Sequence, residues 1–216
     1  MSNPTTQSKR LIVAVTGASG AIYARRMIEV LANLGHEVHV VVSPLGQRLL
    51  HDELSIESIT AEQLAPAAPQ QLHLHNVRDV GATIASGSFR CDGMIIVPCS
   101  SNSLAAVASG LQQNLVHRAA AVTIKERRPL VLVHRETPLT LADIRNMETA
   151  TLAGAVIFPA SPGFYLMPQG IDELVDFVVG RVLDLFDITH DLAIRWKGER
   201  QGNDIRQAAP NHRNDP

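Results

Sequence analysis

The stretch Leu11-Ile-Val-Ala-Val-Thr-Gly-Ala-Ser-Gly20 decides the fold of this chain. Its first part is a short apolar run, typical of a strand that is buried on both faces. Its second part is small and rich in hydroxyl groups, as expected where a helix begins. Met94-Ile-Ile-Val-Pro-Cys-Ser-Ser-Asn-Ser103 has the same arrangement. Two such strand-to-helix turns indicate an open parallel sheet with a ligand at its carboxyl edge, where both turns lie.

Strands and helices alternate along the rest of the chain. We expect further strands at 38–42, 130–133 and 155–158, and helices after Ser19 and Pro44 and at 101–109, 115–127, 141–152 and 171–187. Ser19 is expected to cap the first of these helices. The alternation predicts right-handed crossovers and therefore an α/β fold of Rossmann-like type, a parallel sheet with helices on both faces. Residues 1–10 are expected to be a flexible N-terminus, 11–197 a single domain and 198–216 a polar, disordered tail.

The composition is that of an ordinary globular protein, and it excludes several classes of function. Of the 216 residues, 45% are apolar and 19% are charged, and the formal net charge is −2. Without a basic block, and with only 4% aromatic residues, the chain gives no reason to expect nucleic acid as a partner. No apolar run approaches the roughly 20 residues that span a bilayer, so no membrane association is expected. Two cysteines without a CxxC pair fit a reducing cytoplasm.

The two turns favour a ligand that carries one phosphate. A helix N-terminus presents unpaired N–H groups and a positive dipole end, so it binds anions readily. The dinucleotide pattern G-x-G-x-x-G is absent, and the second strand ends at Ser43 rather than at an acidic residue that would bind a ribose. FMN therefore fits better than a dinucleotide. A tight turn without any ligand would explain the first turn, taken alone, equally well.

Further motifs along the chain resemble those of the UbiX-type flavin prenyltransferases, a family once called aromatic-acid decarboxylases. Any one motif is modest, but six of them in register are specific, and they extend from about residue 10 to residue 197. They are Thr16-Gly-Ala-Ser-Gly-Ala-Ile-Tyr23, Pro98-Cys-Ser100, Lys125-Glu-Arg-Arg-Pro-Leu-Val-Leu132, Arg135-Glu-Thr-Pro138, Pro162-Gly-Phe-Tyr165 and Arg195-Trp196.

The resemblance implies a flavoprotein fold and a prenyltransferase activity. A dimethylallyl group would pass from its monophosphate or diphosphate to N5 and C6 of reduced FMN, without a metal ion. The family typically assembles as a homododecamer, and its prenylated FMN serves a UbiD-type decarboxylase. The positions that match the family's FMN contacts are Gly17, Ala18, Ser19, Ser43, Ser100, Ser101, Asn102, Ser103 and Arg135.

By the same resemblance, four residues are catalytic candidates. Glu136 would take the proton released at C6, and Ser19 would lie close to N5. Lys125 would neutralise the departing phosphate, and Glu53 would reach the site of an adjacent subunit. The substrate would also be bound by Arg135, Tyr165, Arg181 and Trp196. From the sequence alone, the charged residues among these would be solvated surface groups, and Ser19 a helix cap.

The histidines and cysteines give no metal site or nucleophile. His73 and His75 alternate like neighbours on a strand, but no carboxylate or cysteine nearby completes a metal-ligand pattern. His117 and His134 stand isolated. Cys99 follows a buried strand and is expected to be a small packed residue.

Two departures from the family pattern leave other functions open. Pro44 stands where many members have lysine. Ser101-Asn-Ser103 is a local variant that resembles the signature of the flavin-dependent cysteine decarboxylases, which share the flavoprotein fold. Oxidative decarboxylation of a peptidyl or pantothenoyl cysteine is therefore one alternative, which Lys125, Arg135 and Tyr165 disfavour. A non-catalytic FMN-binding protein is the other.

Overall fold

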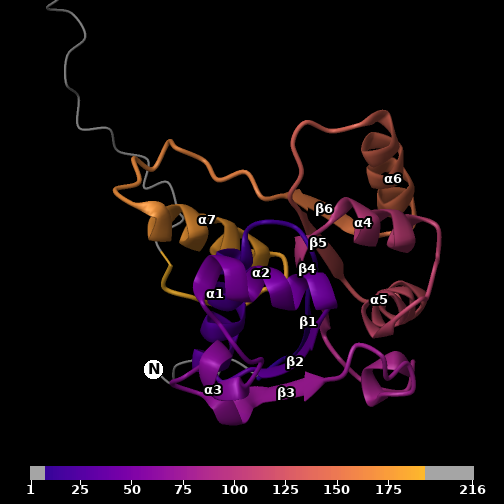
Figure 1. The fold of residues 1–216 in the computed structure, drawn as a ribbon, viewed down its shortest axis with the longest axis horizontal. Coiled ribbons are helices and arrows are strands. Elements are labelled where there is room, and N and C mark those ends of the chain that lie inside the picture. Colours follow the sequence, from indigo (N-terminus) through magenta and orange to yellow (C-terminus); the bar gives the residue numbers. More distant parts are fainter. Residues whose placement is uncertain (1–7, 193–216) are drawn as a thin grey trace, which may run out of the picture.

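Six parallel strands form one sheet in the order β3-β2-β1-β4-β5-β6 (Figure 1). The computed structural model describes residues 8–192. The strands are β1 (Arg10–Val15), β2 (Glu37–Val42), β3 (Leu72–His75), β4 (Gly93–Cys99), β5 (Leu130–His134) and β6 (Val156–Pro159). The order of the strands along the chain reverses between β1 and β4, so this is the switch point of the sheet.

Helices connect the strands and cover both faces of the sheet (Figure 1). The α-helices are α1 (Ala21–Asn33), α2 (Pro44–Leu54), α3 (Ala61–Leu64), α4 (Ser101–Ala108), α5 (Leu115–Lys125), α6 (Leu141–Leu152) and α7 (Ile171–Asp184). Two short 3-10 segments, η1 (Pro69–Gln71) and η2 (Thr83–Ala85), lie beside β3 and before β4. The expected α/β fold, with its parallel sheet and its helices on both faces, is confirmed.

Alternate residues of the central strand enter two separate cores. Leu11 and Val13 pack on the face covered by α1 and α7, whereas Ile12 and Ala14 pack on the face covered by α4 and α5. All four side chains are at most 1% exposed. A strand in this position must be apolar at every residue, and this explains the continuous apolar run of the sequence.

The ends of several elements differ from the expectation. The first strand begins at Arg10, and the two preceding residues also bond to the fold: Ser8 Oγ donates to the carbonyl of Gly35 at 2.8 Å, and Lys9 N donates to His36 Nδ1 at 3.1 Å. Leu34 is the C-terminal cap of α1 and is exposed. Helices α5 and α7 end two and three residues early, at 125 and 184.

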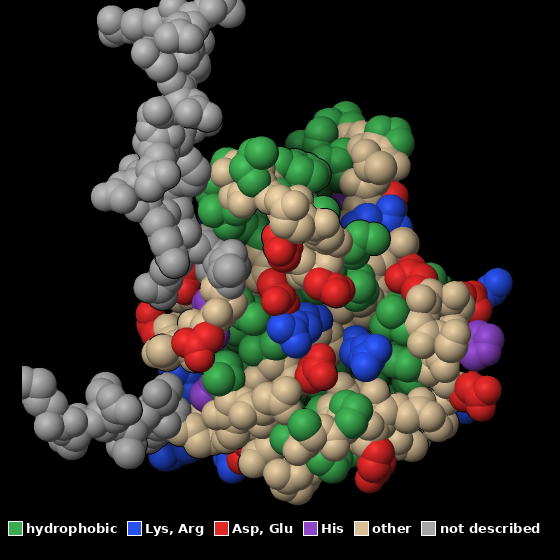
Figure 2. Space-filling view, turned by 90° about the vertical axis from the view of Figure 1, so that its left-hand side faces the viewer, with side chains coloured by type: hydrophobic (Ala, Val, Ile, Leu, Met, Phe, Trp, Pro, Cys, Tyr) green, Lys and Arg blue, Asp and Glu red, His purple; other side chains and the backbone are tan. Residues whose placement is uncertain are grey.

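The surface carries charges of both signs. On the side of the molecule drawn in Figure 2, Lys and Arg side chains are interspersed with Asp and Glu. Some are paired across elements, as Arg26 of α1 is with Asp176 of α7, at 2.6 Å between Nε and Oδ1. None of the helices in the described part of the chain is long and apolar enough to cross a membrane.

Candidate functional site

A pocket with a volume of about 380 Å³ lies at the carboxyl edge of the sheet. It is placed at the switch point between β1 and β4, where open α/β sheets bind their ligands. Most of the side chains that line it are small or carry hydroxyl or amide groups. They belong to Thr16, Gly17, Ser43, Pro44, Leu45, Ser100, Ser101, Asn102, Ser103, Asn114, Val116, His117 and Glu136.

Three helices begin at this pocket. Ser43, Ser100 and Asn114 cap α2, α4 and α5, and each side-chain oxygen accepts a hydrogen bond from the backbone N–H three residues on, at 3.0, 3.2 and 3.1 Å. Each cap satisfies one of the free N–H groups of its helix and leaves others for a ligand. Because three positive helix ends meet there, the pocket suits a phosphate group.

The N-terminus of α1 is different, because a carboxylate of the protein already occupies it. Glu53 Oε2 accepts hydrogen bonds from the backbone N–H groups of Gly20 at 3.0 Å and Ala21 at 2.7 Å. The expectation that Ser19 caps this helix is wrong: the chain turns through Gly20 with φ 114°, so the cap falls one residue later, on a glycine without a side chain. Glu53 therefore has a role within its own chain, and an anionic ligand should bind at α2, α4 and α5 instead.

The turn after β1 depends on a close approach to α2. A Cβ atom on Gly17 would lie 2.5 Å from Cβ of Leu45, so only glycine allows the turn to pack against the start of α2. Thr16 ties this turn to the one after β4, because its Oγ1 donates to the carbonyl of Pro98 at 2.8 Å and accepts from Ser100 N at 2.9 Å. Thr16 was not predicted to be a site residue, although a hydroxyl residue directly after a buried strand indicates such a role.

The loop after β5 brings two further candidates to the pocket. Arg135 Nε donates to the carbonyl of Ser19 at 3.1 Å, which joins this loop to the turn after β1. Glu136 lines the pocket, and its Oε1 accepts a hydrogen bond from Thr137 N at 3.1 Å. Ala18 is 5% exposed and lies within the turn after β1. The nine positions that resemble FMN contacts therefore lie in the pocket or in the turns that border it.

Lys125 does not lie at the pocket of its own chain. Helix α5 begins at the pocket with His117 on its first turn, and Lys125 is its last residue. At a rise of about 1.5 Å per residue, the eight intervening steps place the two residues roughly 12 Å apart along the helix. Lys125 pairs there with Glu126, and both side chains lie against Gly87.

The other substrate candidates also lie elsewhere. The Tyr165 ring meets the Phe177 ring edge to face, with centroids 5.8 Å apart, on the outer side of α7. Arg181 Nη1 pairs with Asp184 Oδ2 at 2.9 Å. Neither Tyr165 nor Arg181 lines the pocket. Trp196 lies outside the described residues.

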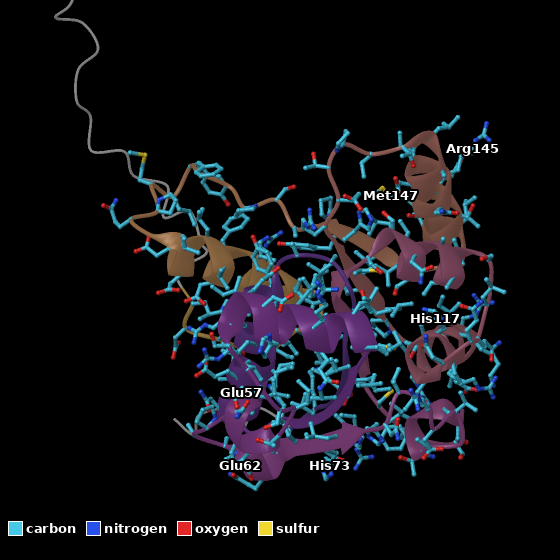
Figure 3. All side chains as sticks on the ribbon, viewed as in Figure 1. Glu57, Glu62, His73, His117, Arg145 and Met147 are labelled. Carbon is cyan, nitrogen blue, oxygen red and sulfur yellow. The ribbon has the colours of Figure 1, made fainter. Side chains whose placement is uncertain are left out.

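His117 is a pocket residue that the sequence analysis did not identify. It lies at the start of α5 (Figure 3) and is 3% exposed, and its Nδ1 is buried without a hydrogen-bond partner among the described residues. Burial lowers its pKa, so the imidazole is neutral at pH 7. A buried polar atom facing a cavity can be satisfied by a ligand. The available signal was Asn114, a cap residue before an apolar helix at the carboxyl edge.

A hydrogen-bond network behind the pocket fixes Ser101. Its Oγ lies 3.3 Å from His134 Nε2, so this histidine is not isolated. Hydrogen bonds from Ser101 and Thr140 lower the pKa of Asp143 to about 2, so this carboxylate stays ionised. The network orients a hydroxyl that faces the pocket. Next to it, burial raises the pKa of the Cys99 thiol to about 12, which agrees with the expected packed, unreactive cysteine.

The sequence predicted no metal site partly because no carboxylate lies near His73 and His75 along the chain, and the structure shows that this reason is wrong. Glu37 brings a carboxylate to the histidines of β2 and β3, with its Oε1 2.9 Å from His39 Nε2 and 3.8 Å from His73 Nε2. Glu37 is far from His73 in the sequence, and only the pairing of β2 with β3 brings them together. This cluster shares no residue with the pocket.

The fold and the pocket define a flavoprotein. The family model described as Flavoprotein matches residues 2–183. Among curated proteins, the flavin prenyltransferase UbiX of Thauera aromatica is 45% identical over 89% of this chain and 96% of its own length. The mitochondrial flavin prenyltransferase PAD1 of Saccharomyces cerevisiae is 44% identical over 88% of this chain and 76% of its own length. This chain therefore belongs to the flavin prenyltransferase family.

Solved structures agree with this assignment. The crystal structure of AnUbiX (PadA1) in complex with FMN and dimethylallyl pyrophosphate superposes with a TM-score of 0.80 and 42% identity, over 90% of this chain and 100% of that one. The FMN-dependent cysteine decarboxylase TvaF is 18% identical with a TM-score of 0.54, which shows a shared fold alone.

Proposed function

We propose that this protein transfers a dimethylallyl group from dimethylallyl phosphate or diphosphate to N5 and C6 of reduced FMN, as a cytoplasmic enzyme whose product serves a UbiD-type decarboxylase. The observation that carries the proposal is the pocket at the switch point, where three helix N-termini and the Glu136 carboxylate meet. It is supported by the relative that was crystallised with FMN and dimethylallyl pyrophosphate.

The residues present fit FMN. Gly17 and Ala18 allow the backbone to approach a flat ring, the hydroxyl of Ser43 can donate to a phosphate, and the oxygens of Ser100 and Ser101 can accept hydrogen bonds from a ribityl chain. His117 adds one unsatisfied buried nitrogen. Reduced FMN supplies the electron-rich nitrogen and carbon that accept the prenyl group.

Glu136 is the carboxylate placed to take up a proton. It lines the pocket beside Arg135, and its Oε1 accepts a hydrogen bond from Thr137 N, while no donor from residues 8–192 binds its second oxygen. A carboxylate held in this way can act as the general base for the proton that leaves the ring carbon after bond formation. Arg135, tied to the carbonyl of Ser19, can bind the phosphate with its remaining donors.

The departing phosphate needs more positive charge than one arginine and the helix ends provide. Lys125, Tyr165 and Arg181 match the phosphate-binding positions of the family, yet they lie away from the pocket of their own chain. We therefore propose that a neighbouring subunit supplies them and that the active assembly is a homododecamer. A UbiX-like relative from Escherichia coli O157:H7 is described as dodecameric, and it shares 40% identity with this chain.

Anaerobic incubation with FMN, a reductant and dimethylallyl phosphate, followed by mass analysis of the extracted flavin, tests the proposal. Flavin that gains the mass of the ring-closed prenyl adduct supports it, and the diphosphate in a parallel reaction decides between the two donors. Release of carbon dioxide from a cysteine-terminated peptide or from pantothenoyl cysteine would instead support a cysteine decarboxylase. Bound FMN that stays unmodified in every reaction would support a non-catalytic flavoprotein.

A further inference from the structure

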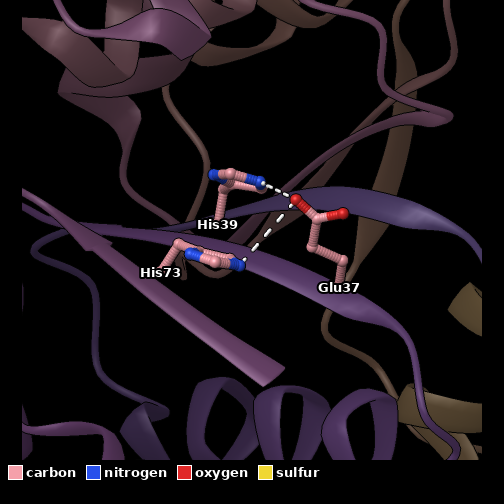
Figure 4. A group of neighbouring side chains, drawn as sticks. All are labelled: Glu37, His39 and His73. Atoms are coloured by element: carbon pink, nitrogen blue, oxygen red, sulfur yellow. Dashed lines mark hydrogen bonds and ion pairs between the residues drawn. The ribbon is translucent and has the colours of Figure 1, made fainter. Parts of the chain in front are cut away.

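Three histidines and a glutamate gather on one face of the sheet at the pairing of β2 with the edge strand β3. Glu37 and His39 are two residues apart on β2 and so point to the same face. His73 of β3 is the register partner of His39, and His75 follows it by two residues. Figure 4 shows one carboxylate oxygen of Glu37 facing a ring nitrogen of both His39 and His73.

The ligand atoms of Glu37, His39 and His73 lie close enough to share one metal ion. One atom from each residue can be chosen so that all three lie within 4.8 Å of one another. Glu37 Oε1 is 2.9 Å from His39 Nε2 and 3.8 Å from His73 Nε2. Around a tetrahedral zinc ion, with bonds of about 2.0–2.1 Å, neighbouring ligand atoms are roughly 3.3 Å apart. The two observed distances to the carboxylate oxygen bracket this value.

We propose that Glu37, His39 and His73 bind one divalent transition-metal ion of the Zn²⁺ type, with water in the remaining position. Two imidazoles and one carboxylate suit zinc and its neighbours in the first transition row. Magnesium and calcium prefer sites made only of oxygen ligands. The metal would link β2 to β3 and would stabilise the pairing of the edge strand.

The surroundings of the cluster hold its ligands in the orientation that a metal requires. His39 Nδ1 hydrogen-bonds to His75 Nε2 at 2.9 Å, which leaves Nε2 of His39 directed at Glu37. Arg10 Nε pairs with the other carboxylate oxygen, Glu37 Oε2, at 2.8 Å. Outer partners of this kind fix the ring tautomer and the carboxylate rotamer in metal sites.

The burial of His39 and the exposure of His73 also favour the binding of a metal ion. His39 is 5% exposed, and the Phe89 ring packs edge-on against it with centroids 4.8 Å apart. The His73 side chain is half exposed and gives a metal ion access from solvent. Figure 3 places His73 on β3, away from His117.

Zinc binding to the purified, chelator-treated full chain tests the site. Equilibrium dialysis against ZnCl₂ should give one saturable ion per chain, and MgCl₂ should give none. Removing an outer partner of a ligand typically weakens metal binding about 10–100-fold. His75→Ala should fall in this range, and loss of a direct ligand in His73→Ala should weaken binding by at least about 100-fold.

His51→Ala is the matched control, because His51 is an exposed histidine that pairs with Asp52 at 3.0 Å, outside the cluster. Zinc should raise the Tm of the wild type and of His51→Ala but not that of His73→Ala. Since His73 is half exposed, its loss should leave the Tm of the metal-free protein nearly unchanged. Absence of saturable zinc binding in the wild type, or binding that His73→Ala retains in full, would overturn the proposal. An equal loss in His51→Ala would overturn it too.

Discussion

A Cβ atom added at Gly17 would lie 2.5 Å from Cβ of Leu45, inside any tolerated contact. Gly17→Ala should therefore push α2 away from the turn after β1, lower the free energy of unfolding by about 1–3 kcal/mol and weaken FMN binding. Gly81→Ala is the control, since its Cβ would meet only Asp79 Oδ1, at 3.4 Å. Urea denaturation and flavin fluorescence titration of both variants measure the effects. Equal stability and equal affinity would show that the close approach is not required.

Glu136→Gln tests the proposed general base at a single atom. The amide keeps the size of the side chain and the hydrogen bond with Thr137 N, but it cannot take up a proton. FMN binding should remain, while formation of the ring-closed product should slow by about 10²–10⁴. Single-turnover mass analysis follows the product, and fluorescence titration follows FMN. A wild-type rate of ring closure would remove Glu136 from this role.

At the scale of elements, apolar runs in the sequence were sufficient to predict strands that are buried on both faces of the sheet. The buried strands β1 and β4 follow from apolar runs in the sequence. The cap of α1 could not be predicted, because the group that binds its N-terminus comes from Glu53, 33 positions away from Gly20. Nor could the place of Lys125 be predicted from a motif. A motif gives the order of residues, whereas the length and direction of α5 decide which edge of the sheet Lys125 reaches.

The capping box of α6, which lies behind the pocket, offers a test at this scale. Thr140 Oγ1 accepts from Asp143 N at 3.2 Å, and Asp143 Oδ2 accepts from Thr140 N at 2.9 Å. Thr140→Ala should lower the free energy of unfolding by about 0.5–2 kcal/mol, whereas Thr140→Ser should retain most of it. Chemical denaturation checks this, and equal losses in the alanine and serine variants would argue against the cap.

For the whole molecule, burial of neutral histidines predicts a dependence of stability on pH. Burial lowers the pKa of His36, His117 and His134 below the ordinary value near 6.5. The unfolded chain therefore binds more protons than the folded one below about pH 6.5, so the free energy of unfolding should fall as the pH falls from 7 to 5. Asp143, with a pKa of about 2, contributes stability that is present above about pH 4 and is lost only as the pH falls from there towards 2. Urea midpoints at fixed protein concentration should drop between pH 7.5 and 5.5, and His117→Gln should flatten the slope.

The pocket itself shows why the complete active site could not be read from one chain. The sequence predicted the turns of the pocket because they lie next to buried strands, whose apolar runs are easy to recognise. Lys125, Tyr165 and Arg181, which are proposed to bind the phosphate, lie on other surfaces of the same chain. No periodicity within one sequence encodes how copies of a chain face one another, since the contact depends on surface shape and symmetry.

Complementation between two inactive variants tests whether one site is built from two chains. Glu136→Gln lacks the proposed base, and Lys125→Ala lacks the proposed phosphate cation, so each homo-oligomer should have little activity. When the two variants are unfolded together and reassembled, about a quarter of shared sites should combine an intact Glu136 from one chain with an intact Lys125 from its neighbour, because subunits mix at random in a symmetric assembly. Activity of the mixed oligomer should then rise well above that of either variant, with light scattering to confirm assembly. If Lys125 served its own chain, every site would carry one of the two lesions and mixing would restore nothing. A fully active monomer on dilution would exclude the shared site altogether.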